Sequence, residues 1–303
     1  MREGLSLPQK RLPPKFFYDP LGSALFDAIC HLPWYSITAA EKHQLAEKGG
    51  EMLETFGAPL ELVELGPGNG EKLEQLALAL GKLQPRAHLH LIDISAAALE
   101  TAIQTLSPIP GARVTCHEGS YLEGLRALPA RGHTERRLAL FLGSNLGNHA
   151  PDEAVEFLRE IRGALHPGDG LLLGVDLVKP EPALRIAYDD PLGVTAAFNK
   201  NLLQRLNREL GADFDLARFS HRVIWNSGES RVEMHLASEG SQIVKIPGAE
   251  MTAAFADGET LWTESSYKYE PDSFRRLVAS AGFTFRAEWI HEKARFIDAL
   301  IMV

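Results

Sequence analysis

The chain has 303 residues, of which 45% are hydrophobic and 23% charged, enough for one large domain or two ordinary ones with a sizeable core. It carries 31 Lys and Arg against 40 Asp and Glu, giving a net charge of -9. Nucleic acid and anionic membranes are therefore not expected as partners, because both select clustered positive charge.

The two cysteines and the N-terminal stretch point to a reducing compartment. Cys30 and Cys116 form no CxxC pair, and the first 20 residues have no apolar core of signal-peptide length. No window is long and apolar enough to span a membrane. We expect a cytoplasmic protein that acts as a monomer.

From residue 60 onward, short runs of Leu, Ile and Val alternate with helix-like segments. This order predicts a parallel, doubly wound sheet with helices on both faces. Ser95 and Pro151 mark the starts of two of the helices. The segments in chain order are strand-like 60–66, helix-like 72–83, strand-like 88–93, helix-like 95–106, strand-like 113–119 and 138–144, helix-like 151–165 and strand-like 170–178.

The end of the chain has a different pattern. A helix at about 272–281 is followed by two strand-like runs, 283–291 and 296–303, which a short polar turn separates. A closing antiparallel hairpin beside a parallel sheet is the outline of the seven-stranded, Rossmann-like methyltransferase fold. A nicotinamide dehydrogenase would instead have six parallel strands.

About 90 residues lie between the fifth strand and the closing helix, too many for a loop. Within them, 183–210 reads as helical, and 221–247 alternates like antiparallel strands. We expect an inserted α+β domain. The predicted division is 41–177 with 269–303 for the sheet domain, and 1–40 with 178–268 for a lid or substrate-binding domain.

Three glycines, Gly66, Gly68 and Gly70, follow the first strand in the stretch VELGPGNGEK. Such a turn could hold a dinucleotide pyrophosphate, hold a methyl-donor nucleoside, or serve only as a tight turn. The spacing GxGxG differs from the dinucleotide fingerprint, and Glu71 at the helix start is a poor neighbour for a pyrophosphate. Asp93, at the end of the second strand, can accept both hydroxyls of a ribose. Together with Glu64 and the closing hairpin, these residues favour S-adenosylmethionine (SAM).

The sequence indicates less clearly which residues bind the substrate that accepts the methyl group. Glu264 and Ser266 share a face if their segment is extended, and could bind a heteroaromatic N–H from one side. Taken alone, however, a glutamate at such a position is more often a solvated surface group. Asn148 follows the fourth strand, where it could bind a ligand or cap the next helix. Tyr35 and Tyr188 suit a small amphipathic substrate or any core.

No metal site can be assembled from local spacing. His88 and His90 share one strand face, but no third ligand stands at a recognisable distance along the chain. We therefore expect neither a metal nor a residue that forms a covalent intermediate.

Longer stretches of the chain are distinctive. They include LPPKFFYDPLGSALFDAI, ELGPGNGEK, FLGSNLGN, LLLGVDLVK, AYDDPLGVTAAFNKN, NRELGADFDL, RVEMHL and TESSYK, in this order. In these stretches the chain resembles the SAM-dependent L-histidine Nα-methyltransferases of ergothioneine biosynthesis, which convert histidine into its trimethylated betaine, hercynine. The resemblance covers nearly the whole chain.

The resemblance implies a role for each matching residue. The expected donor-binding residues are Gly66, Gly68, Lys72 and Asp93, with Ser120 and Tyr121 near the adenine. Gly143 is expected to line the reactive centre, and no side chain is expected to act as a catalytic group. The expected histidine-binding residues are Asn148 and Tyr188 for the α-amine and carboxylate, Tyr35, Glu264 and Ser266 for the imidazole, and Tyr18 and Met234 elsewhere in the pocket.

Two departures from the family pattern concern the pocket. Ser120 stands where an acid is common, and Asn145 where a threonine is usual.

The expected reaction is in-line transfer of methyl groups from SAM to the neutral α-amine of L-histidine, repeated until the amine is trimethylated. The alternatives are an N-methyltransferase of another aromatic amino acid or amine, and a non-catalytic SAM-binding module.

Overall fold

The computed structural model describes residues 1–129 and 136–303, which form two compact units. The inserted unit consists of Met1–Ser36 and Lys179–Tyr267, and the sheet unit of Ile37–Val178 and Lys268–Val303. The chain therefore passes three times from one unit to the other.

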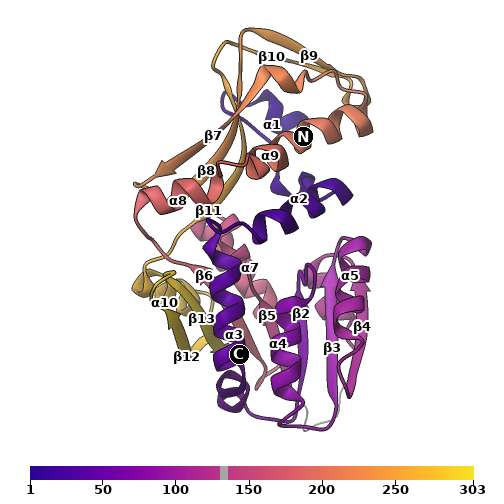
Figure 1. The fold of residues 1–303 in the computed structure, drawn as a ribbon, viewed down its shortest axis with the longest axis vertical. Coiled ribbons are helices and arrows are strands. Elements are labelled where there is room, and N and C mark those ends of the chain that lie inside the picture. Colours follow the sequence, from indigo (N-terminus) through magenta and orange to yellow (C-terminus); the bar gives the residue numbers. More distant parts are fainter. Residues whose placement is uncertain (130–135) are drawn as a thin grey trace. The chain divides into compact units, whose positions relative to one another are not determined.

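The sheet unit contains a seven-stranded sheet, in the order β12-β13-β6-β5-β2-β3-β4 (Figure 1). Strands β2 to β6 pair in parallel, whereas β13 pairs antiparallel with both β6 and β12. This arrangement confirms the seven-stranded fold with a closing hairpin. The strands are β2 (Leu60–Leu65), β3 (Ala87–Asp93), β4 (Ala112–Glu118), β5 (Arg136–Phe141), β6 (Gly170–Asp176), β12 (Thr284–His291) and β13 (Phe296–Met302).

The helices of the sheet unit begin where the sequence signals predicted. Ser95 caps α5 by accepting a hydrogen bond from the Ala98 backbone N–H (3.3 Å), and Pro151 opens α7. Helix α6 was not predicted. The helices are α3 (Ser36–Phe56), α4 (Glu71–Leu80), α5 (Ala96–Leu106), α6 (Tyr121–Ala127), α7 (Pro151–Ala164), α10 (Pro271–Ser280) and the 3-10 helix η2 (Asn145–Asn148).

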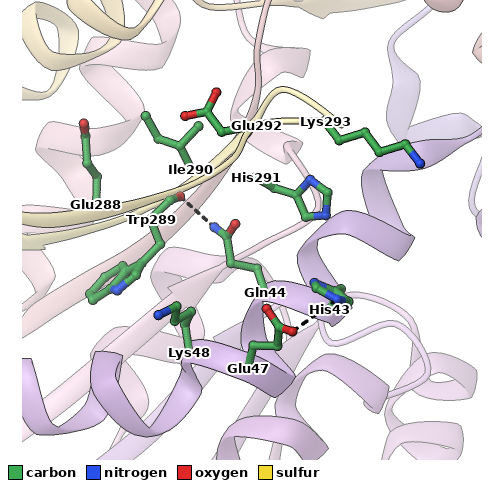
Figure 2. A pocket seen from close by; sticks show the side chains of 10 residues that line it. All are labelled: His43, Gln44, Glu47, Lys48, Glu288, Trp289, Ile290, His291, Glu292 and Lys293. Atoms are coloured by element: carbon green, nitrogen blue, oxygen red, sulfur yellow. Dashed lines mark hydrogen bonds and ion pairs between the residues drawn. The ribbon is translucent and has the colours of Figure 1, made fainter.

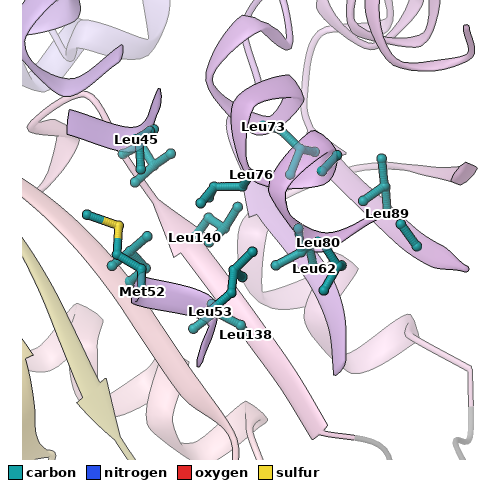
Figure 3. Close-up of a cluster of buried hydrophobic side chains, with 14 of the residues drawn as sticks. Leu45, Met52, Leu53, Leu62, Leu73, Leu76, Leu80, Leu89, Leu138 and Leu140 are labelled. Atoms are coloured by element: carbon teal, nitrogen blue, oxygen red, sulfur yellow. The ribbon is translucent and has the colours of Figure 1, made fainter. Parts of the chain in front are cut away.

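The core of the sheet unit is a cluster of buried leucines between helices and strands (Figure 3). It draws Leu45 and Leu53 from α3 and Leu76 from α4, and it packs them on strand residues such as Leu62 and Leu140. All five are at most 1% exposed. Because burial of one leucine side chain contributes about 1.5–3 kcal/mol, this cluster fixes the strand ends that carry the candidate site.

The inserted unit is built around a four-stranded sheet, in the order β1-β11-β8-β7, with a separate β9-β10 hairpin. The predicted helical and antiparallel segments are confirmed, while β10 was not foreseen. Its elements are α1 (Arg2–Ser6), β1 (Lys10–Arg11), η1 (Pro14–Phe16), α2 (Pro20–Cys30), α8 (Glu181–Tyr188), α9 (Val194–Leu210), η3 (Leu216–Arg218), β7 (Phe219–Asn226), β8 (Arg231–Ser238), β9 (Gln242–Ile246), η4 (Pro247–Ala249), β10 (Met251–Phe255) and β11 (Thr260–Tyr267).

The helices have ordinary lengths for a globular protein. Within the described part of the chain, none is both long and apolar enough to cross a membrane.

Candidate active site

The glycine turn after β2 has a backbone conformation that suits glycine. Gly66, Gly68 and Gly70 have φ angles of 77°, 55° and 80°, which residues with a side chain rarely adopt. A Cβ atom on Gly66 would lie 2.9 Å from the hydroxyl oxygen of Tyr121. The turn therefore presents bare backbone at the carboxyl end of β2, where sheets of this kind bind ligands.

A buried carboxylate connects the next two predicted residues. The Lys72 ammonium donates to Glu41 Oε2 (2.8 Å), and the Gly143 backbone N–H donates to both Glu41 oxygens (2.9 and 2.8 Å). The Glu41 side chain is fully buried. A Cβ atom on Gly143 would come within 3.0 Å of the Lys72 nitrogen. Glu41 thus ties α3 to the start of α4 and to the turn after β5.

Two further buried acids lie in the same region. Neither carboxylate oxygen of Glu64 has a hydrogen-bond partner among the described residues. Burial raises the pKa of Glu64 to about 8; Lys72 opposes this shift, and Glu41 adds to it. Burial also raises the pKa of Asp298 well above its usual range, and the neighbouring charge of Glu41 raises it further. Burial therefore favours the neutral, protonated form of both acids near pH 7, and a positive charge bound beside Glu64 would lower its pKa.

The expected adenosine residues lie at the ends of β3 and β4. Asp93 accepts a hydrogen bond from the Ser95 backbone N–H (2.8 Å), and burial raises its pKa. Tyr121 opens α6, and burial raises the pKa of its hydroxyl, so the hydroxyl remains protonated. Ser120 forms a capping box with Glu123 at the start of α6. Its hydroxyl is therefore engaged in helix capping.

Asn148 is the last residue of η2 and does not cap the next helix. Helix α7 has Ala150 as its N-cap residue, and the Glu153 carboxylate accepts the Ala150 backbone N–H (3.0 Å). The capping interpretation of Asn148 is therefore wrong. Its amide lies two residues before that N-cap, in the short segment that follows the Gly143 turn.

The inserted unit contains the expected acceptor residues other than Asn148. The Tyr188 hydroxyl donates to Ser266 Oγ (2.8 Å), and the Tyr35 ring lies edge-on to the Tyr188 ring with centroids 6.1 Å apart. The Phe26 ring contacts the rings of both Tyr35 and Tyr18 edge-on. The rings come from the segment before α2, from α2, from the loop after it and from α8, and they form one aromatic cluster that Ser266 of β11 joins through its hydrogen bond to Tyr188.

Glu264 lies on the same face of the inserted unit's sheet as Met234. The two residues are directly paired between β11 and β8. Burial raises the pKa of Tyr35 well above its usual range, and the nearby Tyr188, Cys30 and Glu264 side chains raise it further. The carboxylate of Glu264 is therefore close to the tyrosine cluster.

A histidine fixes the end of α8 that carries Tyr188. His221 Nε2 lies 2.8 Å from the Tyr188 carbonyl oxygen, and His221 Nδ1 lies 2.9 Å from the Asn199 amide nitrogen. Since the amide donates, Nδ1 is the acceptor and Nε2 carries the proton. Burial lowers the pKa of His221, which favours this neutral form. Tyr188 is thus held at both its backbone and its hydroxyl.

A separate groove of about 440 Å³ lies along α3 and β12 of the sheet unit (Figure 2). His43, Glu47 and His291 are among its lining residues, and Gln44 donates to the Trp289 carbonyl oxygen (2.6 Å) at its base. None of the expected site residues lines this groove. Across residues 1–129 and 136–303, no three His, Cys, Asp or Glu side chains are grouped to hold a metal ion.

Comparison with known proteins identifies the family. The family model described as "Histidine-specific methyltransferase, SAM-dependent" matches residues 1–303. The chain belongs to this family. It is 41% identical to the "Histidine N-alpha-methyltransferase" of Mycolicibacterium smegmatis over 95% of this chain and 89% of that protein. It is also 41% identical to the protein of the same name from Mycobacterium tuberculosis, over 97% of this chain and 90% of that protein.

A solved structure of a putative methyltransferase from Thermobifida fusca shares 13% of its sequence with this methyltransferase, with a TM-score of 0.48. The match covers 99% of this chain and 97% of that one. Its membership of the family, and not this structural likeness, makes the chain a SAM-dependent methyltransferase. The expected site residues fall into two groups, one in each unit. The sheet unit carries Gly66, Gly68, Lys72, Asp93, Ser120, Tyr121, Gly143 and Asn148, and the inserted unit carries Tyr18, Tyr35, Tyr188, Met234, Glu264 and Ser266.

Glu41 was not predicted as a site residue, although the sequence of its helix carries a signal. In α3 the buried positions Ile37, Glu41, Gln44 and Leu45 follow helical spacing. Two polar residues therefore occupy the apolar stripe of this methyltransferase's longest described helix. A charged residue in such a stripe predicts a buried partner, because an unpaired buried charge is costly.

Proposed function

We propose that this methyltransferase transfers methyl groups from SAM to the α-amine of L-histidine, in successive steps that end at N,N,N-trimethylhistidine (hercynine). The main support is the convergence of Tyr188, Ser266, Glu264 and Tyr35 in the inserted unit, residues far apart in sequence. The relatives named histidine N-alpha-methyltransferases support the same acceptor.

The residues of the sheet unit fit SAM. The glycine turn offers backbone at the end of β2, and the Asp93 carboxylate at the end of β3 suits the two ribose hydroxyls. The buried Glu64 carboxylate, with no hydrogen-bond partner among the described residues, suits a ligand with positive charge. SAM supplies an activated methyl group on a sulfonium. In this proposal Gly66, Gly68, Lys72 and Asp93 hold the donor, and Tyr121 lies beside the adenine.

The inserted unit fits an imidazole. A half-buried carboxylate such as Glu264 accepts an imidazole N–H, and the hydroxyls of Ser266 and Tyr35 can exchange hydrogen bonds with the other ring nitrogen. We assign Asn148 and Tyr188 to the α-amine and carboxylate of the substrate. The faces of Tyr18 and Tyr35 tolerate the growing cation at the amine, while Met234 completes the apolar wall.

In the proposed methyl transfer, the main task of the side chains is to position the two substrates. The neutral α-amine would attack the methyl carbon as the carbon–sulfur bond breaks and the thioether S-adenosylhomocysteine leaves. The methylated ammonium then loses a proton before the next transfer, so the protein must hold the amine in line and let it be deprotonated. No residue needs to form a covalent bond. The rate is expected to rise with pH through the pKa of the bound amine, because only the neutral amine is a nucleophile.

A substrate panel tests this proposal. The enzyme is incubated with methyl-labelled SAM and, in separate reactions, histidine, tryptophan, phenylalanine, tyrosine and histamine. We expect label on histidine above all, and little on histamine, which lacks the carboxylate. Preference for another amine would support the alternative N-methyltransferase, and the absence of label on every amine would indicate a SAM-binding module without activity.

A further inference from the structure

Strand β11 contains an extra residue next to Glu264. Trp262 pairs with His235 of β8, and Glu264 pairs with Met234, the adjacent residue of the same strand. Thr263 therefore has no partner of its own on β8 and forms a β-bulge.

The bulge decides which face Glu264 occupies. In a regular strand, Trp262 and Glu264 would lie on one face because they are two positions apart. Their partners, His235 and Met234, are neighbours and point to opposite faces, so Trp262 and Glu264 also point to opposite faces. Without the extra residue, Glu264 would face away from Met234.

Two side-chain hydrogen bonds hold the bulge. The Trp262 indole N–H donates to the Glu264 carbonyl oxygen (2.9 Å), and the buried Thr263 hydroxyl donates to the Met234 carbonyl oxygen (2.9 Å). On the other edge of β11, the described pairing with β1 ends where the Leu12 backbone N–H donates to the Trp262 carbonyl oxygen (3.0 Å). The Trp262 indole N–H therefore donates to Glu264 in the part of β11 that lies beyond the described pairing with β1.

The indole is itself held by a charged network. The His235 ring stacks on the Trp262 ring with centroids 5.7 Å apart, and the Arg231 guanidinium lies 4.7 Å from the ring centroid. Glu233 accepts from Arg231 Nε (2.7 Å) and lies 3.0 Å from His235 Nε2. Because one carboxylate fixes both neighbours, the indole has a defined orientation.

We propose that Trp262 is a positioning residue that aims the Glu264 side chain, and thereby sets the selectivity of the enzyme for an imidazole. The inference rests on the proposed role of Glu264 in binding histidine. Trp262 acts through the Glu264 backbone, from the opposite face of the sheet, and its own side chain does not share the face of Glu264.

Trp262→Phe tests the inference, since it removes the N–H but keeps a ring for stacking. We expect the KM for histidine to rise about 3- to 10-fold, the range for loss of one hydrogen bond. The kcat and the affinity for SAM should change little. The preference for histidine over phenylalanine, measured as a ratio of kcat/KM values, should fall by a similar factor.

Trp289→Phe is the matched control. The Trp289 indole N–H donates to Glu51 Oε1 (3.0 Å) within the sheet unit, so the same kind of bond is lost. This variant should leave the KM and the selectivity unchanged. Thr263→Val, which keeps the side-chain volume, is a second test of the bulge and should also raise the KM for histidine.

The outcomes are distinguishable. If Trp262→Phe and Thr263→Val both keep the wild-type KM and selectivity, the inference is wrong. It is also wrong if Trp262→Phe and Trp289→Phe lower kcat and raise KM alike, because that pattern indicates general destabilisation. If Glu264→Ala itself leaves histidine binding intact, the proposed function of Glu264 fails first.

Discussion

The two units hold their expected ligand-binding residues by different physical means. In the sheet unit, glycine backbone and buried charge dominate: Lys72 and Gly143 share the Glu41 carboxylate, and Glu64 is buried nearby. In the inserted unit, aromatic rings and hydroxyls surround one half-buried carboxylate. The comparison indicates that the proposed SAM-binding residues depend on glycine turns and a buried carboxylate, and the proposed histidine-binding residues on aromatic packing.

This difference predicts that the two ligands can be affected separately. Substitutions among the acceptor residues should weaken histidine binding and spare SAM, and those around Glu41 should do the reverse. Titration calorimetry with each ligand measures both effects in one protein.

Glu264→Ala is expected to have the largest effect. Without the carboxylate, the imidazole N–H loses its acceptor in a partly desolvated site, and kcat/KM for histidine should fall about 100- to 1000-fold. The affinity for SAM should stay within about 2-fold, since the sheet unit is unchanged. Steady-state kinetics and calorimetry provide the two measurements.

Glu250→Ala is the control for that variant. Glu250 lies in the same unit, and its side chain is 84% exposed beside Arg2. Its removal should leave both ligands unaffected. If Glu264→Ala bound histidine with unchanged affinity, Glu264 would not bind the imidazole. The proposal that substitutions in the two units affect SAM and histidine separately would then also be wrong.

Glu41→Gln is expected to have the next largest effect, on the other ligand. The change removes the negative charge beside Lys72 and weakens the acceptor of the Gly143 N–H. We expect SAM to bind about 10- to 100-fold more weakly and the free energy of unfolding to fall by about 2 kcal/mol. Histidine binding, measured by calorimetry, should change much less.

Lys42→Ala serves as the neighbouring control for Glu41→Gln. Lys42 forms a half-exposed ion pair with Glu71 (2.7 Å), the kind of pair that contributes little to stability. If Lys42→Ala weakens SAM binding as much as Glu41→Gln does, the buried carboxylate has no special role.

Glu64→Gln should produce the smallest change, visible as a dependence of stability on pH. Burial raises the pKa of Glu64 from 4.5 to about 8 in the folded protein. The folded state therefore keeps a proton that the unfolded state loses, and this contribution to stability is lost as pH rises from about 4.5 through 8. The variant should match the wild type near pH 5 and have a higher Tm near pH 9.

Glu61→Gln is the control with the opposite sign. The His90 ring, with Nε2 3.7 Å from the carboxylate, and the Arg137 guanidinium, which donates to Glu61 Oε2 (2.9 Å), lower the pKa of Glu61, on the same strand as Glu64, to about 2. The stabilisation of the folded state by the ionised Glu61 carboxylate is present above about pH 4.5 and is lost as pH falls toward 2. Calorimetric melting that shows a higher Tm near pH 9 for both variants would contradict the account of Glu64.

The sequence was sufficient to predict the fold and the glycine turn after β2. The signals that predicted them are local, because each depends on only a few neighbouring residues. They are the alternating apolar runs, the helix cap at Ser95 and the GxGxG spacing after β2. The closing hairpin was visible for the same reason. Helix α6 was missed because it is only seven residues long and follows β4 closely.

The proposed histidine-binding residues could not be predicted to lie together from their spacing along the sequence. Tyr188 and Ser266 are 78 residues apart, and only the packing of α8 against the sheet of β11 brings them within 2.8 Å. The bulge at Thr263 gives no plain sequence signal, although it decides the face of Glu264. Resemblance to a family suggested the roles of these residues, and the structure shows the contacts that bring Tyr188 and Ser266 together.

The proposed acceptor and product are tested most directly by a time course of the purified enzyme with L-histidine and excess SAM, followed by mass spectrometry of the amino acid. We predict mono- and dimethylhistidine as transient species and N,N,N-trimethylhistidine as the end product, with every methyl group on the α-nitrogen. Methyl groups on the imidazole, or histidine that remains unmodified while another aromatic amine is methylated, would contradict the account.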